Sequence, residues 1–190
     1  MRKVIMLNRV SLDGFFAGPN GEIYDWFITD PEVDKAAHEM AQADTILFGR
    51  VTYQMFESVW PKVAVDPNAP KEARTIANEV NQMTKVVFSK TLKEVPWENS
   101  QLFKGSLAEE VRKLKQRNGP DIMIFGSGTI VQQLSAEGLI DEYLFVVTPV
   151  VLGAGKPLFK DVKKFTLELL EARDFHSGNV LLHYRSDKKQ

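Results

Sequence analysis

Residues 121–134 constrain the fold more than any other part of the sequence, because a short apolar run there leads through a glycine turn into a helix. Ile122 to Phe125 are all apolar and predict a buried strand, and the run Gly126 to Thr129 opens into an amphipathic helical pattern. Glycines let the backbone approach a ligand closely, and the free N–H groups at a helix N-terminus favour a phosphate. The segment therefore predicts a strand, turn and helix that can bind a nucleotide pyrophosphate.

The same residues allow a purely structural interpretation. In that case Gly126 and Gly128 only form a tight turn, and Thr129 caps the helix. A complete dinucleotide-binding fingerprint has a third glycine, but Val131 occupies its position, and the segment does not follow the first strand of the chain. The glycine turn alone does not decide between the two interpretations.

A second segment has the same organisation. Thr45 to Gly49 is a mostly apolar run that ends in glycine, and Arg50 to Phe56 continue in a helical pattern. Two such units in one chain weaken the purely structural interpretation. Arg50 would place a cation at the start of this helix, where the positive end of the helix dipole is unfavourable for it. We therefore expect Arg50 to bind an anion.

Strand and helix patterns alternate over most of the chain, which predicts parallel pairing with right-handed crossovers. Before residue 121 the other predicted strands are Lys3 to Val10, Thr84 to Ser89 and Gln101 to Phe103. Helices are predicted to start near Thr29 and Asp30, at Pro70 and at Ser106. The predicted connections include Ser11 to Gly21 and Val63 to Pro70.

The pattern changes after the glycine turn at residue 126. A long strand is predicted from Glu142 to Leu152, and a hairpin from Phe165 to Ala172 and Asn179 to Tyr184. We therefore expect a single α/β domain over residues 1–190, with a mostly parallel mixed sheet and an antiparallel C-terminal edge.

Composition excludes several classes of function. With 24 Lys and Arg against 25 Asp and Glu, bulk charge gives no reason to expect binding to nucleic acid or to a membrane. The absence of cysteine removes disulfides and Cys-based zinc sites, and the three histidines have no metal-ligand spacing. We expect a cytoplasmic protein without a metal site.

Four motifs, in order, resemble the dihydrofolate reductase-like superfamily. They are Ser11-Leu12-Asp13-Gly14, Phe48-Gly49-Arg50-x-Thr52-Tyr53, Val87-Phe88-Ser89-Lys90 and Phe125-Gly126-Ser127-Gly128-Thr129. The sequence is most similar to the branch that contains the reductase domain of the bifunctional riboflavin-biosynthesis protein, and the late run from Val150 to Phe159 is similar to that branch as well. The resemblance implies a three-layer α/β/α fold and an NADPH-dependent reductase.

The resemblance also assigns residues to the cofactor. It implies that Gly49, Arg50 and Thr52 hold phosphates of NADPH, that Ser89 and Lys90 meet the adenosine 2′-phosphate, and that the turn of Gly126, Ser127, Gly128 and Thr129 holds the pyrophosphate. A hydroxyl beside a cation suits a phosphate dianion, which favours NADPH over NADH.

On the substrate side, the resemblance places Asp13 beside the substrate, and Trp26 is a candidate for lining its pocket. A partly buried Asp13 with a raised pKa could supply the proton that accompanies hydride transfer. Alternatively, Asp13 is a turn residue that binds nearby backbone, and Trp26 only packs on the pocket.

The expected reaction is hydride transfer to a small heterocycle or carbonyl compound, similar to that of 5-amino-6-(5-phosphoribosylamino)uracil reductase. Two alternatives stay open. One is a nucleotide-binding module of the same fold without a competent substrate site. The other is a dihydrofolate reductase, although the stretch Trp26 to Glu32 does not match the spacing of the folate enzymes.

A homodimer is also expected. The predicted strand from Glu142 to Leu152 is apolar on both faces, and near the edge of a small sheet such a surface needs a partner. The resemblance implies a twofold dimer in this part of the fold, so the predicted contact includes residues between Tyr143 and Phe159. If the strand is instead central and covered on both faces, a monomer results.

Overall fold

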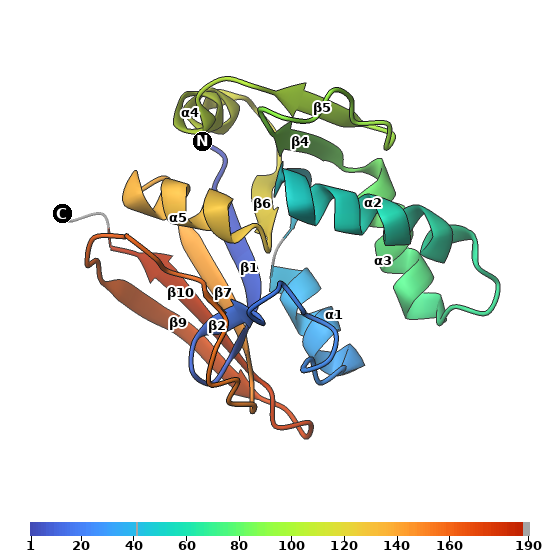
Figure 1. The fold of residues 1–190 in the computed structure, drawn as a ribbon, viewed down its shortest axis with the longest axis vertical. Helices are drawn as coiled ribbons and strands as arrows, with labels where there is room; N and C mark the ends of the chain where they lie inside the picture. Colours follow the sequence, from blue (N-terminus) through green and yellow to red (C-terminus); the bar gives the residue numbers. More distant parts are fainter. Residues whose placement is uncertain (41, 188–190) are drawn as a thin grey trace.

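In the computed structural model, which describes residues 1–40 and 42–187, the chain forms an eight-stranded sheet with helices on both faces (Figure 1). The strand order is β5-β4-β3-β6-β1-β7-β10-β9. The strands of this sheet are β1 (Val4–Ser11), β3 (Ala43–Gly49), β4 (Thr84–Phe88), β5 (Ser100–Phe103), β6 (Asp121–Phe125), β7 (Glu142–Thr148), β9 (Leu167–Asp174) and β10 (Val180–Ser186). The helices are α1 (Pro31–Met40), α2 (Arg50–Val65), α3 (Lys71–Gln82), α4 (Leu107–Gln116) and α5 (Gly128–Ala136).

The predicted mixed sheet is confirmed. Strands β5, β4, β3, β6, β1 and β7 pair in parallel, and β10 pairs antiparallel with both β7 and β9. The last two strands form the predicted hairpin, which turns at residues 175–179. The antiparallel C-terminal edge is therefore present.

Three layers result from the alternation of side chains along the strands. On one face, Ile46 and Phe48 of β3 pack with α2 and α3, and Val146 of β7 packs with α1. On the other face, Leu47 of β3 and Ile124 of β6 pack with α4 and α5. The central strands are apolar on both faces because helices cover both of them.

The structure corrects several predicted boundaries. Strand β7 ends at Thr148 and not at Leu152, because Pro149 cannot donate a ladder hydrogen bond. Helix α2 continues through Pro61 to Val65, so the connection to α3 is shorter than predicted. The predicted loop from Ser11 to Gly21 contains β2 (Phe15–Ala17), which pairs with β8 (Lys156–Pro157).

In the part of the chain that the structure describes, no helix is both long enough and apolar enough to cross a lipid bilayer.

Candidate functional site

The two predicted glycine turns meet at the centre of the sheet. They follow β3 and β6, which are neighbouring parallel strands, and the helices that leave them, α2 and α5, pack on opposite faces. In open α/β sheets, ligands bind at the carboxyl ends of the strands where the connections diverge in this way. The fold therefore places both turns at the position expected for a ligand site.

Direct contacts join the turns. The Gly49 amide donates a hydrogen bond to Ser127 Oγ over 2.9 Å. A Cβ atom on Gly126 would lie 3.6 Å from the methyl carbon of Thr52. The site thus brings together four of the residues predicted from the sequence, Gly49, Thr52, Gly126 and Ser127.

Both helices begin without a side-chain cap. Gly49 is the N-cap of α2 and has no side chain, while Ser127 is the N-cap of α5 and makes no capping bond to that helix. The first helical bonds of α5 run from Ile130 and Val131 to the Ser127 carbonyl oxygen. The first N–H groups of two helices, with the positive ends of two dipoles, therefore face one region, which favours an anion there.

Thr129 is not the cap that the structural interpretation of the turn assigned to it. Helix α5 already includes Gly128 and Thr129, and its N-cap is Ser127, with φ 57° and ψ 59°. Gly126 also has a positive φ, of 54°. A glycine at this position avoids the cost that other residues pay in the left-handed region.

The remaining cofactor candidates continue along the same edge of the sheet. Arg50 is exposed at the first position of α2, where its guanidinium donates to Gln54. Ser89 and the exposed Lys90 follow β4, the neighbour of β3. The Ser89 hydroxyl accepts hydrogen bonds from the amides of Thr91 and Leu92, which fixes the turn after β4.

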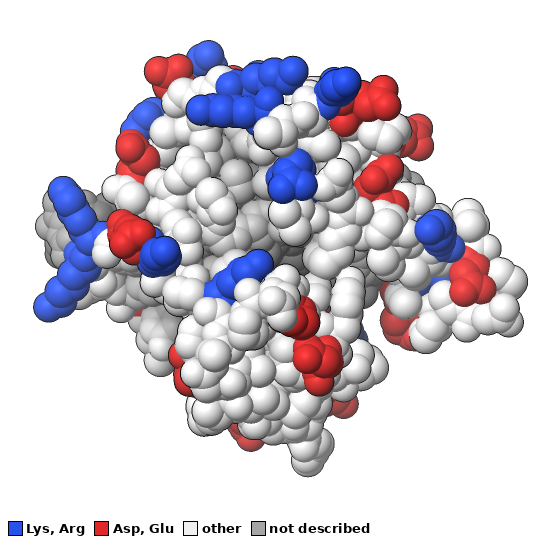
Figure 2. Space-filling model, in the orientation of Figure 1, with Lys and Arg blue, Asp and Glu red and all other residues white. Residues whose placement is uncertain are grey.

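Sequence reasoning missed a second cation at this end. Lys104 is exposed and follows β5, and the Ser89 amide donates to the Phe103 carbonyl oxygen over 3.1 Å. Lys and Arg side chains gather over the end of the molecule formed by α4 and β5 (Figure 2). The sequence predicts a strand from Gln101 to Phe103. If that strand pairs in parallel with the strand that ends at Ser89, the residue after it, Lys104, lies beside Ser89.

Asp13 differs from its predicted state. Its side chain is exposed and accepts hydrogen bonds from the Ser11 hydroxyl at 2.7 Å and from the amides of Leu152 and Gly153 at 3.1 and 2.8 Å. The Ser11 hydrogen bond, with the help of the two amides, holds the pKa of Asp13 below its usual value. The expected partial burial and raised pKa are therefore wrong, and Asp13 is an ionised acceptor that joins two loops.

Phe16 connects this loop to the glycine turn. A Cβ atom on Gly128 would lie 2.5 Å from Phe16 Cζ, so the ring rests against the glycine backbone at the start of α5. Only glycine leaves room for this contact. The segment that carries Asp13 therefore contacts the glycine turn through Phe16.

Trp26 is buried within its own segment. Its indole N–H donates to the Glu22 carbonyl oxygen, and its ring packs edge-on against Phe27 at 4.5 Å. The guanidinium of Arg9, on β1, lies 5.5 Å from the centre of the Phe27 ring. Contacts within residues 22–27 therefore hold Trp26, and its role at a substrate pocket stays a prediction.

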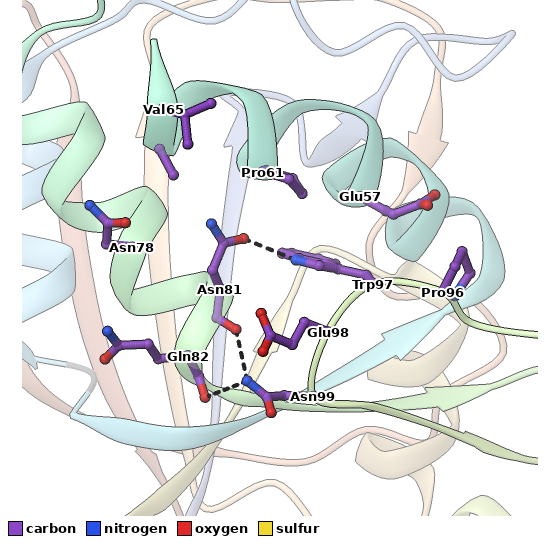
Figure 3. A pocket seen from close by; sticks show the side chains of 11 residues that line it. Glu57, Pro61, Val65, Asn78, Asn81, Gln82, Pro96, Trp97, Glu98 and Asn99 are labelled. Carbon is purple, nitrogen blue, oxygen red and sulfur yellow. Dashed lines mark hydrogen bonds between the residues drawn. The ribbon is translucent and has the colours of Figure 1, made fainter. Parts of the chain in front are cut away.

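A cavity of about 610 Å³ lies elsewhere, between the C-terminal ends of α2 and α3 (Figure 3). The indole of Trp97 forms one wall and donates to Asn81, and Glu98 also lines the cavity (Figure 3). None of the predicted site residues lines this cavity. The cavity opens next to the amino ends of β4 and β5, whereas the glycine turns lie at the carboxyl ends of the strands. We therefore do not assign the candidate site to this cavity.

Comparison with known proteins agrees with the fold and the motifs. The RibD C-terminal domain family matches residues 2–181. The chain is 39% identical over 185 residues to the uncharacterized protein YyaP of Bacillus subtilis (strain 168), an alignment that covers 96% of this chain and 94% of YyaP.

Solved structures show the same fold at low sequence identity. A diaminohydroxyphosphoribosylaminopyrimidine deaminase/5-amino-6-(5-phosphoribosylamino)uracil reductase from Thermotoga maritima is similar with a TM-score of 0.67 and 17% identity, over 98% of this chain and 57% of that one. A dihydrofolate reductase from Enterococcus faecalis in complex with NADP(H) is similar with a TM-score of 0.64 and 13% identity, over 98% and 97% of the two chains. With the family match over nearly its whole length, the chain belongs to the RibD C-terminal domain family.

Proposed function

We propose that the protein is an NADPH-dependent reductase. The observation that carries this proposal is the contact between Gly49 and Ser127, which brings two uncapped helix N-termini to one region at the carboxyl ends of β3 and β6. The similarity to a dihydrofolate reductase in complex with NADP(H) supports a nicotinamide cofactor in a fold of this kind.

The residues present fit the phosphates of NADPH. The amides at the start of α5, in the turn from Gly126 to Thr129, would hold the pyrophosphate, and Arg50 and Thr52 at the start of α2 would contribute a cation and a hydroxyl. Ser89 and Lys90 would meet the 2′-phosphate, and Lys104 adds a second positive charge beside them. Bound NADPH would supply the hydride, while these residues bind and orient it.

The proposed substrate is a small heterocycle or carbonyl compound, by similarity to 5-amino-6-(5-phosphoribosylamino)uracil reductase. Asp13 lies on the segment that reaches the glycine turn through Phe16. Because hydrogen bonds keep Asp13 ionised, we assign it to fixing the loops beside the substrate, and not to donating the proton.

NADPH oxidation against a panel of heterocyclic and carbonyl substrates tests this proposal, once cofactor binding has been shown. A reductase oxidises NADPH with at least one member of the panel. A protein that binds NADPH but reduces none of a broad panel, with dihydrofolate included, favours the alternative of a nucleotide-binding module.

Asp13→Asn should separate the substrate side from the cofactor side. The substitution keeps the size of the side chain but places an amide where Leu152 or Gly153 donates, so the loop edge should move. We expect unchanged NADPH affinity and turnover lower on the order of fivefold, measured with a substrate found in the panel. Unchanged turnover would refute a role for Asp13 at the substrate.

We also propose a homodimer, for a reason that differs from the one given by the sequence. Strand β7 lies between β1 and β10 and is no longer than β1, so its own surface needs no partner. Apolar side chains are nevertheless exposed nearby, with Val151 at 67%, Phe159 at 39% and Leu169 at 52%. These side chains could form the twofold contact that the family resemblance implies.

Sedimentation at micromolar concentration tests the dimer. We expect a species of twice the chain mass, and Val151→Asp together with Leu169→Asp should shift it to the monomer by placing charges in the contact. A single species near 21.5 kDa for the unaltered protein would mean that these side chains stay exposed in a monomer.

A further inference from the structure

Ser127 has a backbone conformation that needs an explanation. It is a non-glycine residue with φ 57° and ψ 59°, directly after Gly126 with φ 54°. The left-handed region is unfavourable for a residue with a Cβ atom. Glycine would adopt this conformation at lower cost, so the serine side chain must contribute something that glycine cannot.

The hydroxyl makes a contact outside its own helix. Ser127 is buried, with 8% of its surface exposed, and its Oγ accepts the hydrogen bond from the Gly49 amide over 2.9 Å. An N-cap serine ordinarily accepts a bond from its own helix, but Ser127 makes no such bond to α5. The left-handed conformation therefore directs the hydroxyl across to the start of α2.

This contact has consequences for both helices. It holds Gly49, the N-cap of α2, against the residue that precedes α5. The hydroxyl makes no bond to its own helix, so the first N–H groups of α5 stay available to a ligand. A second approach joins the same two turns, because the methyl carbon of Thr52 would lie 3.6 Å from a Cβ atom on Gly126.

We propose that Ser127 is a positioning residue. Its hydroxyl sets the separation of the α2 and α5 N-termini so that both can bind the phosphates of one nucleotide cofactor. The inference rests on the proposed function and deepens it, since it changes the role of the Ser127 side chain from a cofactor ligand to a clamp between the two cofactor-binding turns.

Ser127→Gly tests the proposal, because it removes the hydroxyl and also relieves the left-handed strain. We expect NADPH affinity about fivefold lower, because the contact that sets the separation of the two helix N-termini is lost. The hydrogen bond itself contributes to stability, but relief of the left-handed strain offsets its loss, so the thermal unfolding midpoint should be unchanged or higher. Ser127→Ala removes the hydroxyl and keeps the strain, so it should lose the same affinity and unfold at a lower temperature than Ser127→Gly.

The possible results separate this inference from the proposed function. Wild-type affinity in Ser127→Gly overturns the positioning role while NADPH binding stands. A fall in affinity that comes with an equal loss of stability in Ser127→Gly also overturns it, since Ser127 is then only a structural residue. An unaltered protein that binds no NADPH overturns the proposed function, and the positioning role with it.

Discussion

Replacing Lys90 by Glu is expected to weaken NADPH binding on the order of 30-fold, or about 2 kcal/mol, and to change NADH binding much less. Lys90 is exposed after β4, beside Ser89, where the 2′-phosphate is proposed to bind. The substitution removes a charge-assisted contact and places a carboxylate near a dianion, whereas NADH has no phosphate at that position. Titration calorimetry with the two cofactors measures the difference.

Lys62→Glu is the matched control. It makes the same change in net charge at an exposed lysine in the last turn of α2, and the length of the helix separates it from Arg50 by roughly 18 Å. This control should alter the affinity for both cofactors only slightly, through long-range charge. Equal losses of NADPH and NADH affinity in Lys90→Glu would refute the role of Lys90 at the extra phosphate.

Gly155→Ala is expected to destabilise the protein by about 2 kcal/mol, because the new methyl group would overlap backbone. A Cβ atom there would lie 2.5 Å from the Ala17 carbonyl oxygen and 2.9 Å from Phe15 Cγ. The methyl group would push β2 away from β8, and with it Phe16 from Gly128. Thermal unfolding should show a midpoint lower by roughly 4 to 8 °C for a chain of this size.

Gly105→Ala provides the control for this glycine. No atom lies within 4 Å of a Cβ at Gly105, and its φ is outside the left-handed region, so the substitution should change stability by less than about 0.5 kcal/mol. If the two alanine variants unfold at the same temperature, close packing between β2 and β8 does not stabilise the loop that carries Asp13.

Much of the fold could be predicted because local patterns agreed with it. The apolar run before Gly126 and the apolar run before Gly49 are central parallel strands, and both lead into helices as predicted. Asp30 accepts hydrogen bonds from the amides of Glu32 and Val33 and so caps α1, at the start predicted near Thr29 and Asp30. These features depend on residues close together in the sequence.

What could not be predicted depends on contacts between distant segments. Two of the hydrogen bonds to the Asp13 carboxylate come from the amides of Leu152 and Gly153, far along the chain. The pairing of β2 with β8 and the hydrogen bond from Gly49 to Ser127 likewise join segments with no local signal for each other. Strand β7 ends at Thr148 because Pro149 follows it. The apolar residues after Pro149 led to the prediction that the strand continues to Leu152.

Titration of the unaltered protein with NADPH and with NADH tests the central claim most directly. We predict saturable binding of NADPH, with an affinity at least tenfold higher than that for NADH, on the order of one charge-assisted contact. The prediction follows from two uncapped helix N-termini, from Arg50 at the start of α2, and from Lys90 and Lys104 after the neighbouring strands β4 and β5. Absence of binding for both nucleotides would contradict the proposed cofactor site. Equal affinities would leave a nucleotide site but contradict its selectivity for the 2′-phosphate.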